Sequence, residues 1–148
     1  MRHISPSSIR PIDFDRLVWS DSLSVGNQVI DQQHRKLIQI CHDGVGHFRC
    51  KDTNPEAAHQ CLNDFVAFLR VHFDTEEDVL LRGHCPSDIY QRHIAEHSKY
   101  LEALTEILVE GVWQELDGER LIELMVGWVL HHLTAFDLPS KAFMADCV

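Results

Sequence analysis

Seven polar side chains of metal-binding types lie on the apolar stripes of helical segments in this sequence, and they limit the possible fold most. Five are histidines and two are acids: His34, His72, Glu76, His93, His97, His132 and Asp137. A histidine on an apolar stripe becomes buried when the helix packs, and a buried imidazole needs a hydrogen-bond partner or a metal ion. Five such histidines in one small core therefore indicate a metal site between packed helices.

Four stretches of the chain show the periodicity of amphipathic helices. They run from about residue 27 to 48, from 54 to 83, from 86 to 111, and from 117 to beyond 136. The second begins with Asn54-Pro55-Glu56, a typical helix start, and we expect Pro139 to disturb or end the fourth. We find no alternation typical of strands. The pattern predicts an all-α, antiparallel up-down-up-down four-helix bundle with an irregular N-terminal arm.

Length and charge are typical of one globular domain. We expect a single domain over residues 1–148, with an arm at 1–26, the bundle at 27–138 and a tail at 139–148. The formal net charge of −10 argues against nucleic acid or an anionic membrane as a partner. No apolar run approaches the length of a membrane-spanning helix, and no export signal is visible. We therefore expect a cytoplasmic protein, and the sequence leaves its oligomeric state open, a monomer included.

Two pairs of these polar residues are four positions apart, which places both members on one side of a helix. The pairs are His72 with Glu76 and His93 with His97. His34 and His132 add one histidine from each remaining helix. Imidazole suits iron, zinc, copper and nickel, and the set is too large for a tetrahedral zinc site. It favours two ions that share both carboxylates.

Asp137 fits this pattern least well. It follows His132 by five residues, which on a regular helix turns its side chain about 140° away from that histidine. Spacing alone therefore leaves Asp137 undecided as a ligand. A local distortion near Pro139 would bring the two side chains together, and π-helical bulges often occur at functional sites.

The motifs around these residues resemble those of the bacterial hemerythrins. The matching segments are Trp19-Ser20, Gly26-Asn27, Ile30–His34, His72–Glu77 (H-F-x-x-E-E), His93–His97 (H-x-x-x-H) and Trp128–Asp137 (W-x-x-x-H-x-x-x-x-D). The resemblance covers about residues 19–137 and fills every ligand position of the family, Asp137 included.

This resemblance implies a non-haem di-iron centre that binds O2 reversibly, with an oxo or hydroxo group between the two iron ions. It implies that one iron is held by His93, His97 and His132, that the other is held by His34 and His72, and that both are bridged by Glu76 and Asp137. The second iron then has one donor fewer than the first. O2 is therefore expected at the open position beside His34 and His72.

The sequence gives weaker indications of a role near the site for three further residues. We expect Glu77 to be solvated or to support a ligand. Asp31 either supports a ligand imidazole, because such rings usually donate their other N–H to an acceptor, or caps the first helix. Trp128 lies four residues before His132 and is expected to pack over the site.

The ligand set also separates possible functions. Oxygen-activating di-iron enzymes in helix bundles use mainly carboxylates, whereas five of these seven residues are histidines. We therefore expect no enzymatic activity and favour a carrier, store or local supplier of O2, with an unidentified protein as recipient. The alternatives are an O2 or redox sensor acting through a separate partner, a di-iron enzyme acting on peroxide or NO, and an iron store.

Overall fold

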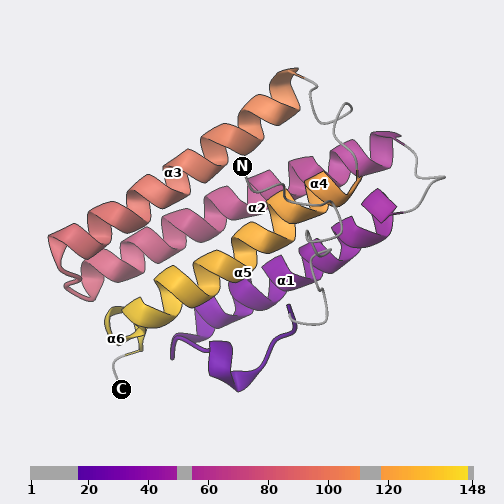
Figure 1. Ribbon diagram of the computed structural model, residues 1–148. Coiled ribbons are helices and arrows are strands. Elements are labelled where there is room, and N and C mark those ends of the chain that lie inside the picture. The colour runs from indigo at the N-terminus through magenta and orange to yellow at the C-terminus, as the bar shows by residue number, and fades with distance from the viewer. Residues whose placement is uncertain (1–16, 50–54, 111–117, 147–148) are drawn as a thin grey trace, which may run out of the picture.

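The computed structural model describes residues 17–49, 55–110 and 118–146, and within these ranges it contains helices and no strand (Figure 1). Its long helices are α1 (Gln28–Arg49), α2 (Pro55–Arg82) and α3 (Ser87–Glu110). A fourth, composite helix runs from α4 (Gly118–Ile122) to α6 (Lys141–Met144). Four helices at nearly the expected bounds confirm the predicted helical bundle. The predicted helix start at Asn54 lies outside the described residues.

The composite helix is continuous but irregular. After α4 come a π-helical turn at Glu123–Gly127, α5 (Trp128–His132), a second π-helical turn at Leu133–Asp137 and a 3-10 turn at Leu138–Ser140. Pro139 disturbs the helix as predicted but does not end it, because α6 continues to Met144. The regular i→i−4 bonding that a proline would break is already replaced in these turns.

The helices bury their apolar stripes against one another. α1 packs on α2 and on α4, and α2 also packs on α3, so that the four long elements lie side by side in Figure 1. The main core draws on all four, for example Leu37, Phe65, Leu104 and Val129. A second, smaller apolar cluster consists of Val25, Ile30, Val79, Leu80 and Met144. It begins about one helical turn beyond His34 and Glu76, so apolar side chains lie on both sides of these polar residues.

The segment Lys141–Asp146, which we call the C-terminal clasp, fastens the end of the composite helix to the start of α1. The Asn27 side-chain amide donates to the Met144 carbonyl oxygen at 3.0 Å, and the Asp146 N–H donates to the Gly26 carbonyl oxygen at 2.9 Å. The clasp also lies against the end of α2. A Cβ on Gly83 would stand 1.9 Å from the Phe143 carbonyl oxygen, so only glycine fits there.

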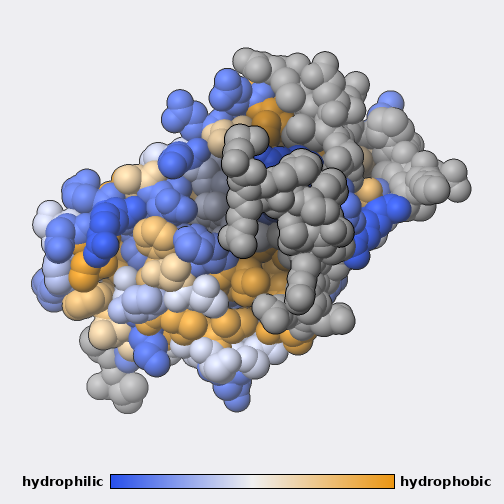
Figure 2. All heavy atoms as spheres, in the orientation of Figure 1, coloured by the Kyte–Doolittle hydropathy of each residue, from blue (hydrophilic) through white to orange (hydrophobic). Residues whose placement is uncertain are grey.

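One prediction about the composite helix needs correction. Its segment Glu119–Met144 is long and apolar enough to cross a membrane by length and composition, although no segment was expected to approach that limit. In the bundle its apolar residues Leu121, Met125, Val129 and Leu133 are buried, and the core helix of a bundle passes the same test. On the face drawn in Figure 2, hydrophobic residues appear over the middle of the molecule and hydrophilic ones gather along α3.

Candidate metal centre

The seven residues singled out by the sequence come together in one buried cluster between the four helices. They come from α1 (His34), α2 (His72 and Glu76), α3 (His93 and His97) and the composite helix (His132 and Asp137). Each is at most 2 % exposed to solvent. The apolar stripes therefore carry six of them inward, as their spacing predicted, and Asp137 is buried with them.

The second π-helical turn places Asp137 in this cluster. A π-helix makes i→i+5 hydrogen bonds, which bring residues five apart onto nearly the same side. The turn spans Leu133–Asp137, directly before Pro139. As a result the Asp137 Oδ1 atom lies 3.0 Å from the Nε2 atom of His132. The distortion that the sequence required is present at the predicted place.

Each carboxylate faces two groups of histidines, one with each oxygen. Glu76 Oε1 lies 3.1 to 3.3 Å from the Nε2 atoms of His93, His97 and His132, whereas Oε2 lies 3.1 Å from His72 and 3.5 Å from His34. Asp137 Oδ1 lies 3.0 Å from His93 and His132, whereas Oδ2 lies 3.1 Å from His34. The cluster is therefore divided into a three-histidine side and a two-histidine side that share both carboxylates.

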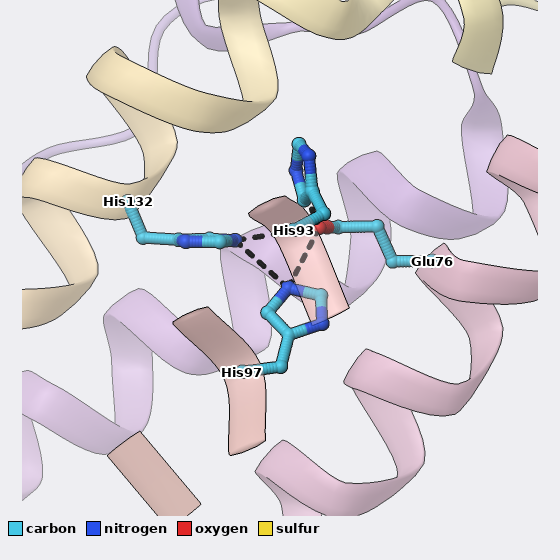
Figure 3. Close-up of side chains that lie close together, drawn as sticks. All are labelled: Glu76, His93, His97 and His132. Carbon is cyan, nitrogen blue, oxygen red and sulfur yellow. Dashed lines mark hydrogen bonds and ion pairs between the residues drawn. The ribbon is translucent and has the colours of Figure 1, made fainter. Parts of the chain in front are cut away.

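Both sides have the compactness that a metal ion requires. On the three-histidine side, donor atoms of Glu76, His93, His97 and His132 lie within 4.8 Å of one another, and Figure 3 shows these side chains directed toward a common point. On the two-histidine side, the same holds for His34, His72, Glu76 and Asp137. Two ions would thus find donors in adjacent positions.

Several polar atoms in the cluster face one another at ion-pair distance but form no hydrogen bond of good geometry. Among the buried atoms without a hydrogen bond are Nε2 of His34, Nε2 of His72, Oε2 of Glu76 and Oδ2 of Asp137. All four belong to the two-histidine side. A buried polar atom without a hydrogen bond costs about 1–3 kcal/mol, so these contacts satisfy the four atoms only in part. Imidazole and carboxylate donors fit iron, and an ion bound here would satisfy these atoms.

The electrostatics of the cluster favour charged carboxylates. Burial works against ionisation, but the surrounding imidazoles hold the pKa of Glu76 well below its usual range and lower the pKa of Asp137. Burial also disfavours charged imidazoles, yet the two carboxylates raise the pKa of His34 and His93 to about 9 and that of His132 to about 10. Metal binding to the free chain must therefore displace protons from these rings.

Two imidazoles of the cluster, those of His72 and His97, have a hydrogen-bond partner on Nδ1, the ring nitrogen that faces away from the cluster. His97 Nδ1 lies 2.9 Å from Glu77 Oε2, which gives Glu77 the supporting role that was one of its two expected roles. His72 Nδ1 lies 2.8 Å from Gln33 Oε1. Gln33 was not identified from the sequence, because its position before His34 does not show that it contacts a histidine of another helix.

Asp31 takes neither of the two roles considered for it, support of a ligand imidazole or capping of the first helix. Its carboxylate accepts hydrogen bonds from the Val25 N–H at 2.9 Å and from the Ser24 hydroxyl at 2.5 Å. It thus fixes the segment that leads into α1. The cap of α1 itself is Asn27, whose Oδ1 accepts from the Ile30 N–H at 3.1 Å.

Aromatic rings stack on two imidazoles of the three-histidine side. Trp128 packs over the site as expected: its ring lies 4.5 Å from the His132 ring at an interplanar angle of 10°. Tyr100 stacks on the other face of Trp128 at 3.9 Å, and Phe73 stacks on His97 at 3.9 Å. His132 has no partner on Nδ1, so ring stacking takes the place of a hydrogen bond in orienting it.

A helical bundle that encloses histidines on both sides of two shared carboxylates is typical of one class of metal-binding protein. The chain belongs to the family described as Hemerythrin HHE cation binding domain, whose model matches residues 25–137. This confirms the resemblance inferred from the motifs, and the matched span contains all seven cluster residues.

Individual relatives are distant. The chain is 25% identical to a bacteriohemerythrin of Stenotrophomonas maltophilia over 123 residues, which is 82% of this chain and 76% of that protein. It is 22% identical to a hemerythrin-like protein of Naegleria gruberi over 126 residues, 85% of this chain and 92% of that protein. No solved structure matches the chain significantly.

Proposed function

We propose that this protein binds O2 reversibly at two iron ions held by the seven-residue cluster. The observation that carries the proposal is the division of each carboxylate between the two groups of histidines. In this arrangement His93, His97 and His132 would hold one iron, His34 and His72 would hold the other, and Glu76 and Asp137 would offer oxygens to both. Bound iron supplies a redox-active centre to which O2 can attach and from which it can leave.

The two-histidine side is the proposed position of O2. It offers one imidazole fewer than the other side, and its four inward-facing donor atoms form no hydrogen bond of good geometry. The second apolar cluster, which includes Ile30, Val79 and Leu80, begins next to it. An uncharged diatomic ligand is compatible with these apolar surroundings, which also keep water from the ligands.

We further propose a carrier, store or local supplier of O2 and not an enzyme. Only two of the seven ligands are carboxylates, in contrast to oxygen-activating di-iron enzymes. Each ligand is at most 2 % exposed, so a larger substrate has no direct approach to the cluster. The same proposal includes an antiparallel bundle, which the short connection between α2 and α3 supports. Residues 1–16 of the expected N-terminal arm at 1–26 lie outside the described residues.

Iron content and visible spectra test the function. We expect about two iron ions per chain and an oxo-to-iron charge-transfer band in the oxidised form. The reduced protein should develop a visible band on mixing with O2 and lose it when O2 is removed. Binding of a single iron, or a band that never disappears on O2 removal, would contradict the proposal. Steady turnover of peroxide or NO would favour the enzyme alternative instead.

A further inference from the structure

The two hydrogen-bonded imidazoles differ in what fixes the position of their proton. A neutral imidazole carries one N–H, and its other nitrogen is the one that can bind a metal. The partner of His97 is the carboxylate of Glu77, which only accepts, so this contact favours the proton on Nδ1 whichever of its oxygens faces the ring. The partner of His72 is the amide of Gln33, which can donate from its nitrogen or accept at its oxygen. Gln33 alone therefore leaves the His72 proton undetermined.

Thr75 settles the direction of this hydrogen bond. Its hydroxyl lies 2.8 Å from the Val71 carbonyl oxygen, which only accepts, so the hydroxyl must donate its single proton there. Thr75 Oγ1 can then only accept from Gln33 across 3.1 Å, which requires the amide nitrogen at that end. The amide oxygen consequently faces His72 Nδ1 at 2.8 Å, and that nitrogen must carry the proton.

A competing acceptor makes this constraint necessary. On the inner side of the ring, His72 Nε2 lies 3.1 Å from Glu76 Oε2. Without a fixed acceptor at Nδ1, this carboxylate would favour the proton on Nε2, which would block the nitrogen that faces the cluster. We propose that Thr75 and Gln33 form a relay that holds His72 with its proton on Nδ1 and so keeps Nε2 free for the metal ion. Both are positioning residues, and the inference rests on the proposed metal centre.

The relay acts on the side of the cluster that has fewer imidazoles. His72 is one of only two histidines on the two-histidine side, and its partner there, His34, has no hydrogen bond on Nδ1. Loss of the correct His72 tautomer would leave that side with a single well-oriented imidazole. The ion at the proposed O2 position is therefore the one whose retention depends on Thr75. Thr75 acts on it indirectly, through Gln33 and His72.

Three variants and a matched control test the relay. Thr75→Val removes the hydroxyl that orients the amide, and Gln33→Leu removes the amide. Gln33→Glu is the rescue variant, because a carboxylate accepts at both ends. Thr105→Val is the control: Thr105 lies on α3 about two turns beyond His97, and its hydroxyl accepts from Arg70 at 3.1 Å, away from the cluster.

The first measurement is 15N NMR of the metal-free chain at neutral pH, which distinguishes the two imidazole tautomers. We expect His72 to carry its proton on Nδ1 in the wild type, in Gln33→Glu and in Thr105→Val. We expect the proton on Nε2 in Gln33→Leu, and a mixture or Nε2 in Thr75→Val. A wild-type His72 that is protonated on Nε2 or on both nitrogens would overturn the inference.

The second measurement is titration with Co2+, which needs no oxygen chemistry. Loss of a hydrogen-bond partner of a metal-binding histidine typically weakens binding by about 10–100-fold. We expect that loss for the more weakly bound Co2+ in Thr75→Val and Gln33→Leu but not in Gln33→Glu or Thr105→Val. Equal affinities in all variants would overturn the relay. A wild type that binds no Co2+ or iron would instead remove the proposed function, while the NMR result would still stand.

Discussion

Substitution of Gly83 by alanine should loosen the C-terminal clasp. The added Cβ would lie 1.9 Å from the Phe143 carbonyl oxygen, whereas real Cβ contacts essentially never fall below 3.0 Å. The obstacle is backbone and not the end of a flexible side chain. The clasp must therefore move away from α2 by about 1 Å or detach.

The cost follows from what the clasp contributes. Its displacement withdraws Met144, which is 1 % exposed, from the second apolar cluster and weakens the bonds that Asn27 and Gly26 make to the clasp. Complete loss of a buried methionine costs about 2–5 kcal/mol, and each hydrogen bond contributes about 1 kcal/mol. Replacing glycine returns at most about 1 kcal/mol through the unfolded chain. Because the clasp is displaced and not removed, only part of these contributions is lost. We expect the free energy of unfolding to fall by about 2–4 kcal/mol.

Urea unfolding measures this change. With a slope of about 2 kcal/mol/M, the midpoint should fall by about 1–2 M. Gly46→Ala is the matched control, because a Cβ there meets nothing within 4 Å and alanine is the better helix former. Hydrogen exchange should show faster exchange of the Asp146 amide, which is bonded to Gly26. If Gly83→Ala unfolds at the wild-type urea concentration with an equally protected clasp, the close-approach argument is wrong.

Three other perturbations follow from the site and its surroundings. Tyr100→Phe keeps the ring on Trp128 but leaves the Leu124 carbonyl oxygen without its 2.5 Å hydrogen bond, so thermal unfolding should show a loss of about 1–2 kcal/mol; an unchanged Tm would contradict this role. In the metal-free chain, His34 and His132 have pKa values raised to about 9 and 10, above the unfolded value of about 6.5. Their stabilising contribution is thus complete below about pH 6.5 and is lost as the pH rises through 9 to 10, so the urea midpoint should fall over that range, and a flat profile would refute it. Removal of the metal by a chelator should lower the Tm, since an ion that binds only the folded chain stabilises it; an equal Tm with and without metal would indicate no such linkage.

Much of the fold could be predicted because apolar periodicity and burial coincide here. Every predicted ligand stands on a stripe that packs inward, so spacing alone was enough to place six of them on one side of their helices. Asp137 could not be placed in this way, since its position depends on hydrogen bonding within the helix. The family resemblance included it, and the π-helical turn gives the physical reason.

Other features depend on contacts between elements that spacing does not encode. Gln33 stands next to a ligand on α1 but serves a histidine on α2, whereas Asp31 turns back toward its own N-terminal segment. The first π-helical turn, Glu123–Gly127, had no sequence signal; in the structure Tyr100 from α3 bonds to a carbonyl oxygen within it. Such pairings become visible only when the helices are placed in space.

The second π-helical turn gives the composite helix one residue more than a regular turn would hold. In a regular helix the neighbour of His132 one turn later is position 136, and the ring of Phe136 lies 5.3 Å from the His132 ring at 13°. The extra residue brings Asp137 to the same imidazole. Phe136 and Asp137 thus both contact His132, although consecutive side chains on an α-helix point about 100° apart. Deleting one residue from this turn would leave an unbroken helix that keeps only one of these neighbours, so the metal centre cannot be transferred intact onto regular helices.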